Sequence, residues 1–181
     1  MRLTDKRYEE LKQEVSNLLE TYCVEYYPLS MLELALCMKI PVKSYSVLGP
    51  ETKLLGKLQS ADAFTIWIEN EPQILFNEQN SKNRCRFSLA HELAHIWLEH
   101  TEDNEVNESE ANFFAGYLLA PVPLINHYGI DDPYEVSNIF RISFEASLNA
   151  LSRAEKRRHS RKNNEIYEYE IVNMCKLERC D

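Results

Sequence analysis

The sequence predicts an α+β fold that is mostly helical, with a small, largely antiparallel sheet of three to four strands packed beside one of the helices. Apolar residues recur at helical spacing before residue 40 and again after residue 80. Between these regions, short runs that alternate or are β-branched are separated by turn residues. A chain of 181 residues, 44% of them hydrophobic, can bury one substantial core. We therefore expect residues 1–160 to form one domain.

The N-terminal region predicts two helices. Residues 4–22 carry Tyr, Leu and Val side chains at helical spacing, with Thr4 or Asp5 as the N-cap. Pro28 is suited to open a second helix over residues 29–38, because proline is favoured in the first turn of a helix. Stripes of this kind usually form core, so we assign both helices a packing role.

The middle region predicts the sheet. Phe64, Ile66 and Ile68 alternate with their neighbours at the period of a half-buried strand. Groups of turn-forming residues stand at 49–50, 60–62 and 70–72. The expected strands are residues 41–47, 54–59, 63–69 and 73–77.

Helical patterns return after residue 80. Ser81 can cap a helix that ends near His100, and Ser143 can cap a later one. The run IYEYEIV at 166–172 lies in the C-terminal tail, residues 161–181, and is expected to be a short strand or disordered. The expected helices of this half are residues 81–100, 108–120, 133–140 and 144–158.

The charge of the chain argues against general nucleic-acid binding. The net charge is −9, whereas phosphate affinity needs clustered Lys and Arg. The basic run at residues 153–162 is the only support for DNA contact, and charge at a helix C-terminus is more simply explained by solvation and the helix dipole. We therefore expect no direct nucleic-acid binding.

The sequence also indicates a cytoplasmic protein. No apolar run is long enough to span a bilayer, and the charged N-terminus does not resemble a secretory signal. Five cysteines, an odd and scattered set, argue against a disulfide framework. Cys175 and Cys180 are five positions apart, which is not the tight spacing of a zinc knuckle.

The run HELAH is the strongest functional signal. His91 and His95 are four positions apart, so on a helix both imidazoles can reach one Zn²⁺ ion. Glu92 beside them can act as the general base of a peptidase, taking a proton from a water that zinc activates. The composition gives roughly 0.02 chance matches to this pattern in such a chain. Burying this cluster without a metal would be costly, so we expect one catalytic zinc per chain.

A catalytic zinc needs a third protein ligand, and the following helix offers two carboxylates. Glu108 shares a face with Ala111 and Ala115, whose small side chains would let this helix approach the HELAH helix closely. Glu110 points about 200° around the wheel from Glu108 and is expected to be a solvated surface carboxylate. We therefore predict Glu108 as the ligand and Asn112, one turn on, as its hydrogen-bonding outer-shell partner.

A further side chain is expected to help zinc to stabilise the oxyanion. A Tyr or His donor is expected, and the sequence does not choose among its candidates. These are His100, Tyr117, His127 and Tyr128.

The stretch RFSLAHELAHIWLEH, followed by ESEANFFAGYLLAP, resembles the ImmA/IrrE family of zinc metallopeptidases. In that family the HExxH helix precedes a helix of the form E-x-x-A-[ND]-x-F-A-x-x-L-L-x-P. The two motifs cover residues 86–121, and the chain departs only at Ala120, where the family often has Met. The resemblance implies a gluzincin-like site in which His91, His95 and Glu108 bind zinc and Glu92 is the base.

The resemblance also implies a substrate class. Proteins of this family cleave helix-turn-helix repressors and so switch on mobile-element or stress genes, and this chain resembles the short, stand-alone form. We therefore expect a zinc-dependent endopeptidase that makes a specific cut in such a repressor. The alternative is a catalytically silent member that binds a repressor or toxin partner, against which the intact motif, Glu92 included, argues.

Overall fold

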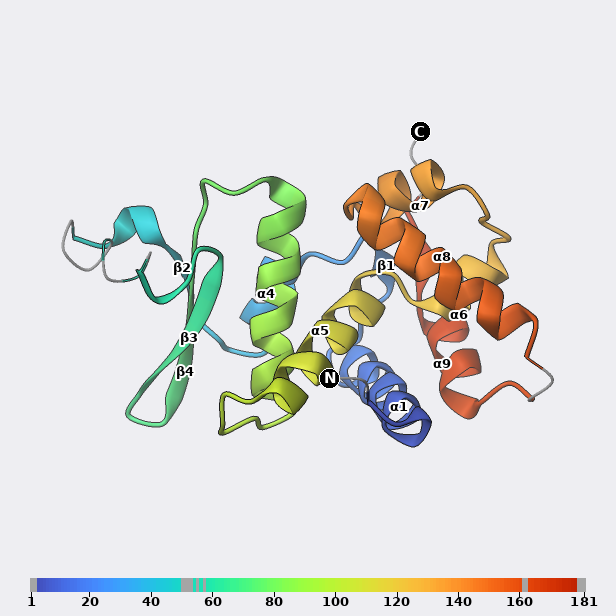
Figure 1. The fold of residues 1–181 in the computed structure, drawn as a ribbon, viewed down its shortest axis with the longest axis horizontal. Coiled ribbons are helices and arrows are strands. Elements are labelled where there is room, and N and C mark those ends of the chain that lie inside the picture. The colour runs from blue at the N-terminus through green and yellow to red at the C-terminus, as the bar shows by residue number, and fades with distance from the viewer. Residues whose placement is uncertain (1–2, 50–53, 55, 57, 161–162, 179–181) are drawn as a thin grey trace.

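The computed structural model describes residues 3–49, 54, 56, 58–160 and 163–178. The fold is α+β and mostly helical, as the sequence predicts, with the sheet at one end and most helices at the other (Figure 1). The helices are α1 (Asp5–Thr21), α2 (Met31–Cys37), α4 (Lys82–Trp97), α5 (Glu105–Leu119), α6 (Val122–His127), α7 (Pro133–Phe140), α8 (Phe144–Arg158) and α9 (Ile166–Met174). The strands are β1 (Tyr26–Tyr27), β2 (Val42–Ser44), β3 (Ala63–Ile68), β4 (Glu71–Phe76) and β5 (Lys176–Leu177).

The larger sheet is mixed rather than largely antiparallel. Its strand order is β2-β4-β3, in which β3 and β4 are antiparallel and β2 is parallel to β4. Residues 45–62 separate β2 from β3 in the chain, so β2 can pair with the far side of β4 instead of joining a hairpin. The β3–β4 turn consists of Glu69 and Asn70, both at positive φ, and β4 therefore starts within the expected turn at 70–72.

The expected strand at 54–59 is wrong where the chain is described. Residues 54, 56, 58 and 59 are helical, while residues 55 and 57 lie outside the described residues. The run LLGKLQ contains no β-branched residue, and leucines four apart suit a helix better than a strand.

The C-terminal segment at 166–172 is a helix and not the expected strand or disordered tail. Tyr167 and Ile171, four positions apart, are both buried, and Glu165 with Glu168 forms a capping box at the start of α9. Helix α9 packs against α1 and α6, and the short strand β5 then pairs in parallel with β1. Alternation in a seven-residue window does not distinguish such a helix from a strand.

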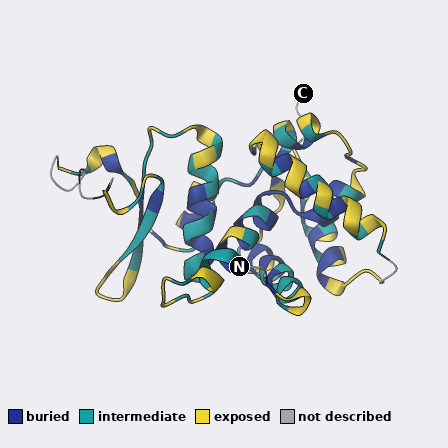
Figure 2. Cartoon of the chain, viewed as in Figure 1, coloured by how far each residue is buried: buried dark blue, intermediate teal, exposed yellow. Residues whose placement is uncertain are grey.

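Helix α4 is the centre of the molecule. One side contacts β3 and β4 and another contacts α5, so α4 lies between the sheet and the helical layer (Figures 1 and 2). Ala90 and Ala94 of α4, like Ala111 and Ala115 of α5, have 0% exposure. The small residues allow the two helices to lie close together, as the sequence predicts. This contact brings the start of α5 beside the HELAH motif.

Other elements also follow the expected pattern. Thr4 caps α1, Ser81 caps α4 and Ser143 caps α8, each by accepting a hydrogen bond from a backbone N–H three residues on. Helix α6 was not expected, because Pro121 and Pro123 read as a stop. Pro121 instead is the N-cap of this helix and Pro123 lies in its first turn, where no backbone N–H is required.

Two further predictions concern the chain as a whole. Cys23, Cys37, Cys85 and Cys175 are free thiols, which confirms for the described cysteines that no disulfide framework exists, while Cys180 lies outside the described residues. None of the helices in the described part of the chain combines the length and the apolar character needed to cross a bilayer.

Arg86 fastens the first turns of α4 to two other parts of the fold. Its guanidinium donates to the carbonyl oxygens of Phe140 (2.8 Å), Arg141 and Leu29 (2.9 Å). The Arg86→Met variant would leave these carbonyls without a donor, so we expect the free energy of unfolding to fall by about 2–3 kcal/mol. Urea denaturation measures this change. Lys82→Met, an exposed control on the same helix, should change it by less than about 0.5 kcal/mol; an equal effect of both substitutions would contradict the assigned role.

Candidate metal centre

His91 and His95 lie on one face of α4, as their spacing predicts. Their Nε2 atoms are 3.0 Å apart. Two nitrogens bound to a tetrahedral zinc at 2.0–2.1 Å would be roughly 3.3 Å apart, so the pair is already close to chelating geometry. Burial and the neighbouring His95 lower the pKa of His91, which favours the neutral imidazole that a metal requires.

Glu108 from the first turn of α5 completes a set of three ligand atoms. Its Oε1 lies 3.2 Å from Nε2 of His95, and its Oε2 lies 3.4 Å from Nε2 of His91. The three ligand atoms all lie within 4.8 Å of one another. Two imidazoles and a carboxylate form a donor set that suits zinc and leaves one position for water or substrate. These residues therefore fit the metal that the motif predicts.

Glu92 lies in the same cleft, held by the sheet. The Thr65 hydroxyl on β3 donates to Oε2 of Glu92 at 2.7 Å. Burial raises the pKa of Glu92, and the bond from Thr65 acts in the opposite direction. The cleft has a volume of about 250 Å³, and its walls include Thr65, Trp67, Glu92, His95 and Glu108. The HELAH motif itself gives no sign of Thr65, because that contact depends on how β3 packs against α4.

Asn112 lies one turn beyond Glu108, and its outer-shell role stays a prediction. Its Nδ2 donates to the Glu108 carbonyl oxygen at 2.8 Å. Its amide lies close enough to His91 to raise the pKa of that ring, although less than burial lowers it. The buried Nδ1 of His91 nevertheless meets no hydrogen-bond partner among the described residues, so Asn112 is the nearest candidate to orient this ligand.

The expectation that Glu110 is a solvated surface carboxylate is wrong. It is only 6% exposed and accepts two hydrogen bonds from Arg7 of α1, at 2.7 Å from Nε and 2.6 Å from Nη2. As its position on the helical wheel predicts, Glu110 lies on a different side of α5 from the ligand Glu108. That side of α5 does not face solvent, because α1 covers it. Arg7 lowers the pKa of Glu110 through these bonds, so the carboxylate stays charged.

His100 connects this ion pair to the metal site. Its Nδ1 lies 3.0 Å from Nδ1 of His95, and its Nε2 lies 3.2 Å from Oε2 of Glu110. Helix α4 ends at Trp97, and positive φ at Glu99 turns the chain back so that His100 packs against His95. Metal-binding histidines commonly bond through the second nitrogen to an orienting group. His100 and Glu110 are placed to orient His95 in this way.

The other three oxyanion candidates are not among the residues that line the cleft. Tyr117 faces a second cavity on the far side of α5. His127 stacks edge-on against Tyr128, whose hydroxyl accepts from the backbone N–H of Leu177 at 3.5 Å. His100 does line the cleft, but both of its ring nitrogens face protein partners.

Comparison with known families supports the resemblance noted in the sequence. A search among curated proteins found no match. The family model of peptidase M78, described as the IrrE N-terminal-like domain, matches residues 52–152, more than half of the chain. The matched segment contains the HELAH helix and Glu108, together with Thr65 and His100. The chain therefore belongs to the M78 peptidase family of IrrE N-terminal-like domains.

Proposed function

We propose that this protein is a zinc-dependent endopeptidase in which His91, His95 and Glu108 bind one zinc ion and Glu92 is the general base. The convergence of two imidazoles and a carboxylate beside the partly buried Glu92 supports this assignment most directly. A bound zinc supplies a Lewis acid that activates water and polarises the substrate carbonyl. Membership of a peptidase family agrees with this chemistry.

Glu92 transfers the proton in the proposed reaction, and Thr65 holds its carboxylate in place. Thr65 donates to Oε2 of Glu92 and holds the carboxylate in the cleft, where it can accept the proton of the attacking water. Protonated Glu92 then donates this proton to the leaving amide nitrogen, so the carboxylate is restored and the peptide bond is broken. Burial raises the pKa of Glu92, which makes it a better proton acceptor than an exposed glutamate.

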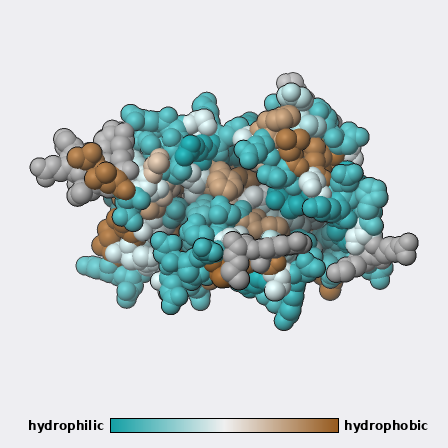
Figure 3. All heavy atoms as spheres, in the orientation of Figure 1, coloured by the Kyte–Doolittle hydropathy of each residue, from teal (hydrophilic) through white to brown (hydrophobic). Residues whose placement is uncertain are grey.

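Strand β3 is suited to hold the substrate in an extended conformation. It is an edge strand among the described strands, and its Thr65 and Trp67 line the cleft. An extended segment can add to such an edge through main-chain hydrogen bonds. Trp67 is 59% exposed and Ile68 is 52% exposed, and Figure 3 shows apolar residues gathered over the sheet end of the molecule. We infer that an unfolded or loop segment with apolar side chains is preferred.

The substrate we propose is a helix-turn-helix transcriptional repressor of a mobile element or stress response, cleaved in the cytoplasm. This part of the proposal rests on the family to which the chain belongs. The acidic net charge of −9 suits a basic protein substrate such as a DNA-binding repressor better than the DNA itself.

Metal removal tests the proposal. The purified protein should contain about one zinc per chain, and a chelator should abolish cleavage of a co-expressed helix-turn-helix repressor until zinc is restored. Zinc at 100 times its Kd should also stabilise the fold by about 2.7 kcal/mol, which thermal unfolding detects. The absence of zinc even after supplementation would contradict the metal site. Zinc binding with repressor capture but no cut would favour the silent interaction module.

A further inference from the structure

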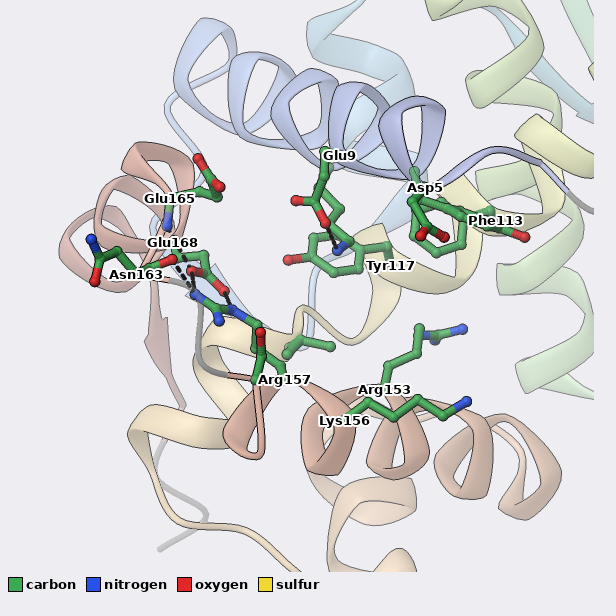
Figure 4. Close-up of a pocket in the computed structure, with 14 residues that line it drawn as sticks. Asp5, Glu9, Phe113, Tyr117, Arg153, Lys156, Arg157, Asn163, Glu165 and Glu168 are labelled. Atoms are coloured by element: carbon green, nitrogen blue, oxygen red, sulfur yellow. Dashed lines mark hydrogen bonds and ion pairs between the residues drawn. The ribbon is translucent and has the colours of Figure 1, made fainter.

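A second cavity lies on the side of α5 opposite the metal site. It has a volume of about 560 Å³ and lies between α1, α5, α8 and the start of α9 (Figure 4). Tyr117 faces it, nine positions beyond Glu108, which corresponds to the opposite side of the helix. The volume falls within the range of small-molecule sites in proteins.

Aromatic side chains form one wall of this cavity. Phe113 and Tyr117 are stacked with ring centroids 5.9 Å apart, and Tyr8 of α1 lies 4.7 Å from Phe113. Val122 adds an aliphatic surface. A planar apolar group could therefore lie against this wall with favourable ring contacts.

Half of the charged side chains that line the cavity form ion pairs with one another. Lys12 bonds to Glu9 at 2.8 Å, and Arg157 bonds to Glu168 at 2.6 Å. These pairs neutralise two of the acidic side chains that line the cavity. They also show that part of the basic run at 153–162 is committed to contacts within the protein rather than to solvent.

Arg153 lines the cavity without a counter-charge among the described residues. Its guanidinium lies 5.8 Å from the centre of the Phe113 ring, and it makes no hydrogen bond or ion pair with any residue in the described ranges. Its Nε is fully buried and lacks a partner there. Lys156, one turn further along α8, lines the same cavity without an ion pair to a described carboxylate (Figure 4). Burial lowers the pKa of Arg153, which reflects how poorly the cation is solvated.

We propose that this cavity binds a small aromatic carboxylate, with the carboxylate on Arg153 and Lys156 and the ring against the partly exposed Tyr8 and Phe113. A cation removed from water without a counter-charge is costly, and an anion would offset that cost. Asp5 and Glu165 also line the cavity and repel a second negative charge. The site therefore favours a single carboxylate over a phosphate dianion.

Calorimetric titration of the full chain with phenylacetate tests the proposal, with phenyl phosphate and benzyl alcohol as comparison probes. We expect phenylacetate to bind more tightly than either comparison probe. Arg153→Met, which keeps the apolar stem over Phe113, should weaken phenylacetate binding about tenfold or more. Arg158→Met is the matched control, because Arg158 is exposed on the same helix and bonds to Asn126 instead. It should leave the affinity unchanged.

The stability of Arg153→Met separates a ligand-binding role from a structural one. Without ligand, the melting temperature of this variant should equal or exceed that of the wild type, because a partly buried cation without a counter-charge has been removed. A lower melting temperature would show that Arg153 supports the fold and would overturn the proposal. So would phenylacetate failing to bind, binding of benzyl alcohol as tightly as phenylacetate, or undiminished affinity in Arg153→Met.

Discussion

Replacement of Glu92 by glutamine should reduce the rate of substrate cleavage by at least about 10³-fold while zinc binding persists. The amide has nearly the size of the carboxylate and can still accept the hydrogen bond that Thr65 donates at 2.7 Å. It cannot accept the proton of the attacking water. Glu92 is not one of the three residues whose ligand atoms converge, so its replacement leaves that set intact. Cleavage is followed by electrophoresis of the repressor and zinc content by elemental analysis.

A matched control shows whether the loss of activity depends on the position of Glu92 and not on the loss of a carboxylate in general. Glu145→Gln makes the same chemical change at an exposed position on α8, away from the metal site, and should retain full activity. If Glu92→Gln cleaved at the wild-type rate, the proposed mechanism would be wrong. If it lost both cleavage and zinc, Glu92 would have to be reassigned as a ligand.

Local patterns were sufficient to predict the core of the site. The spacing of His91 and His95 determines a common helix face, and the two small residues of α5 predict the close approach that brings Glu108 to them. These relations depend on helix geometry, which the sequence encodes within a few turns. The same reasoning predicted the caps at Ser81 and Ser143, which the structure confirms.

Residues that act through tertiary contacts were not predictable in this way. Thr65 reaches Glu92 from 27 positions away, and Arg7 reaches Glu110 from 103 positions away. No periodicity relates such pairs, so the burial of Glu110 could not be inferred from its place on the helical wheel. The mixed sheet has a similar origin, because the side on which β2 joins β4 depends on the path of residues 45–62. The sequence offers His100 as a possible oxyanion donor. Its contacts with His95 and Glu110, however, depend on the turn after α4.

Substitutions of Glu108 and Glu110, both on α5, test which of these carboxylates binds zinc and which supports a zinc ligand. Glu108→Gln should weaken zinc affinity by more than the 10- to 100-fold that loss of an outer-shell partner typically costs, because it removes a direct ligand. The stability of the metal-free protein should hardly change, because the side chain of Glu108 is 46% exposed and its contacts lie within the metal site. Competition with a chromophoric chelator measures the affinity, and urea denaturation in the absence of zinc measures the stability.

Glu110→Gln should reduce the stability of the protein more, and its zinc affinity less, than Glu108→Gln does. The metal-free protein should lose about 2 kcal/mol of stability, less than for a fully buried ion pair because the side chain of Arg7 is 36% exposed. Zinc affinity should fall by about 10- to 100-fold, since His100 would lose the carboxylate that helps it to orient His95. If Glu110→Gln instead lost zinc completely while Glu108→Gln kept it, the assignment of ligand and support would be reversed. Glu108 and Glu110 are two positions apart on the same helix, so a general disturbance of α5 would affect both variants alike. The assigned roles instead predict that Glu108→Gln loses more zinc affinity and that Glu110→Gln loses more stability.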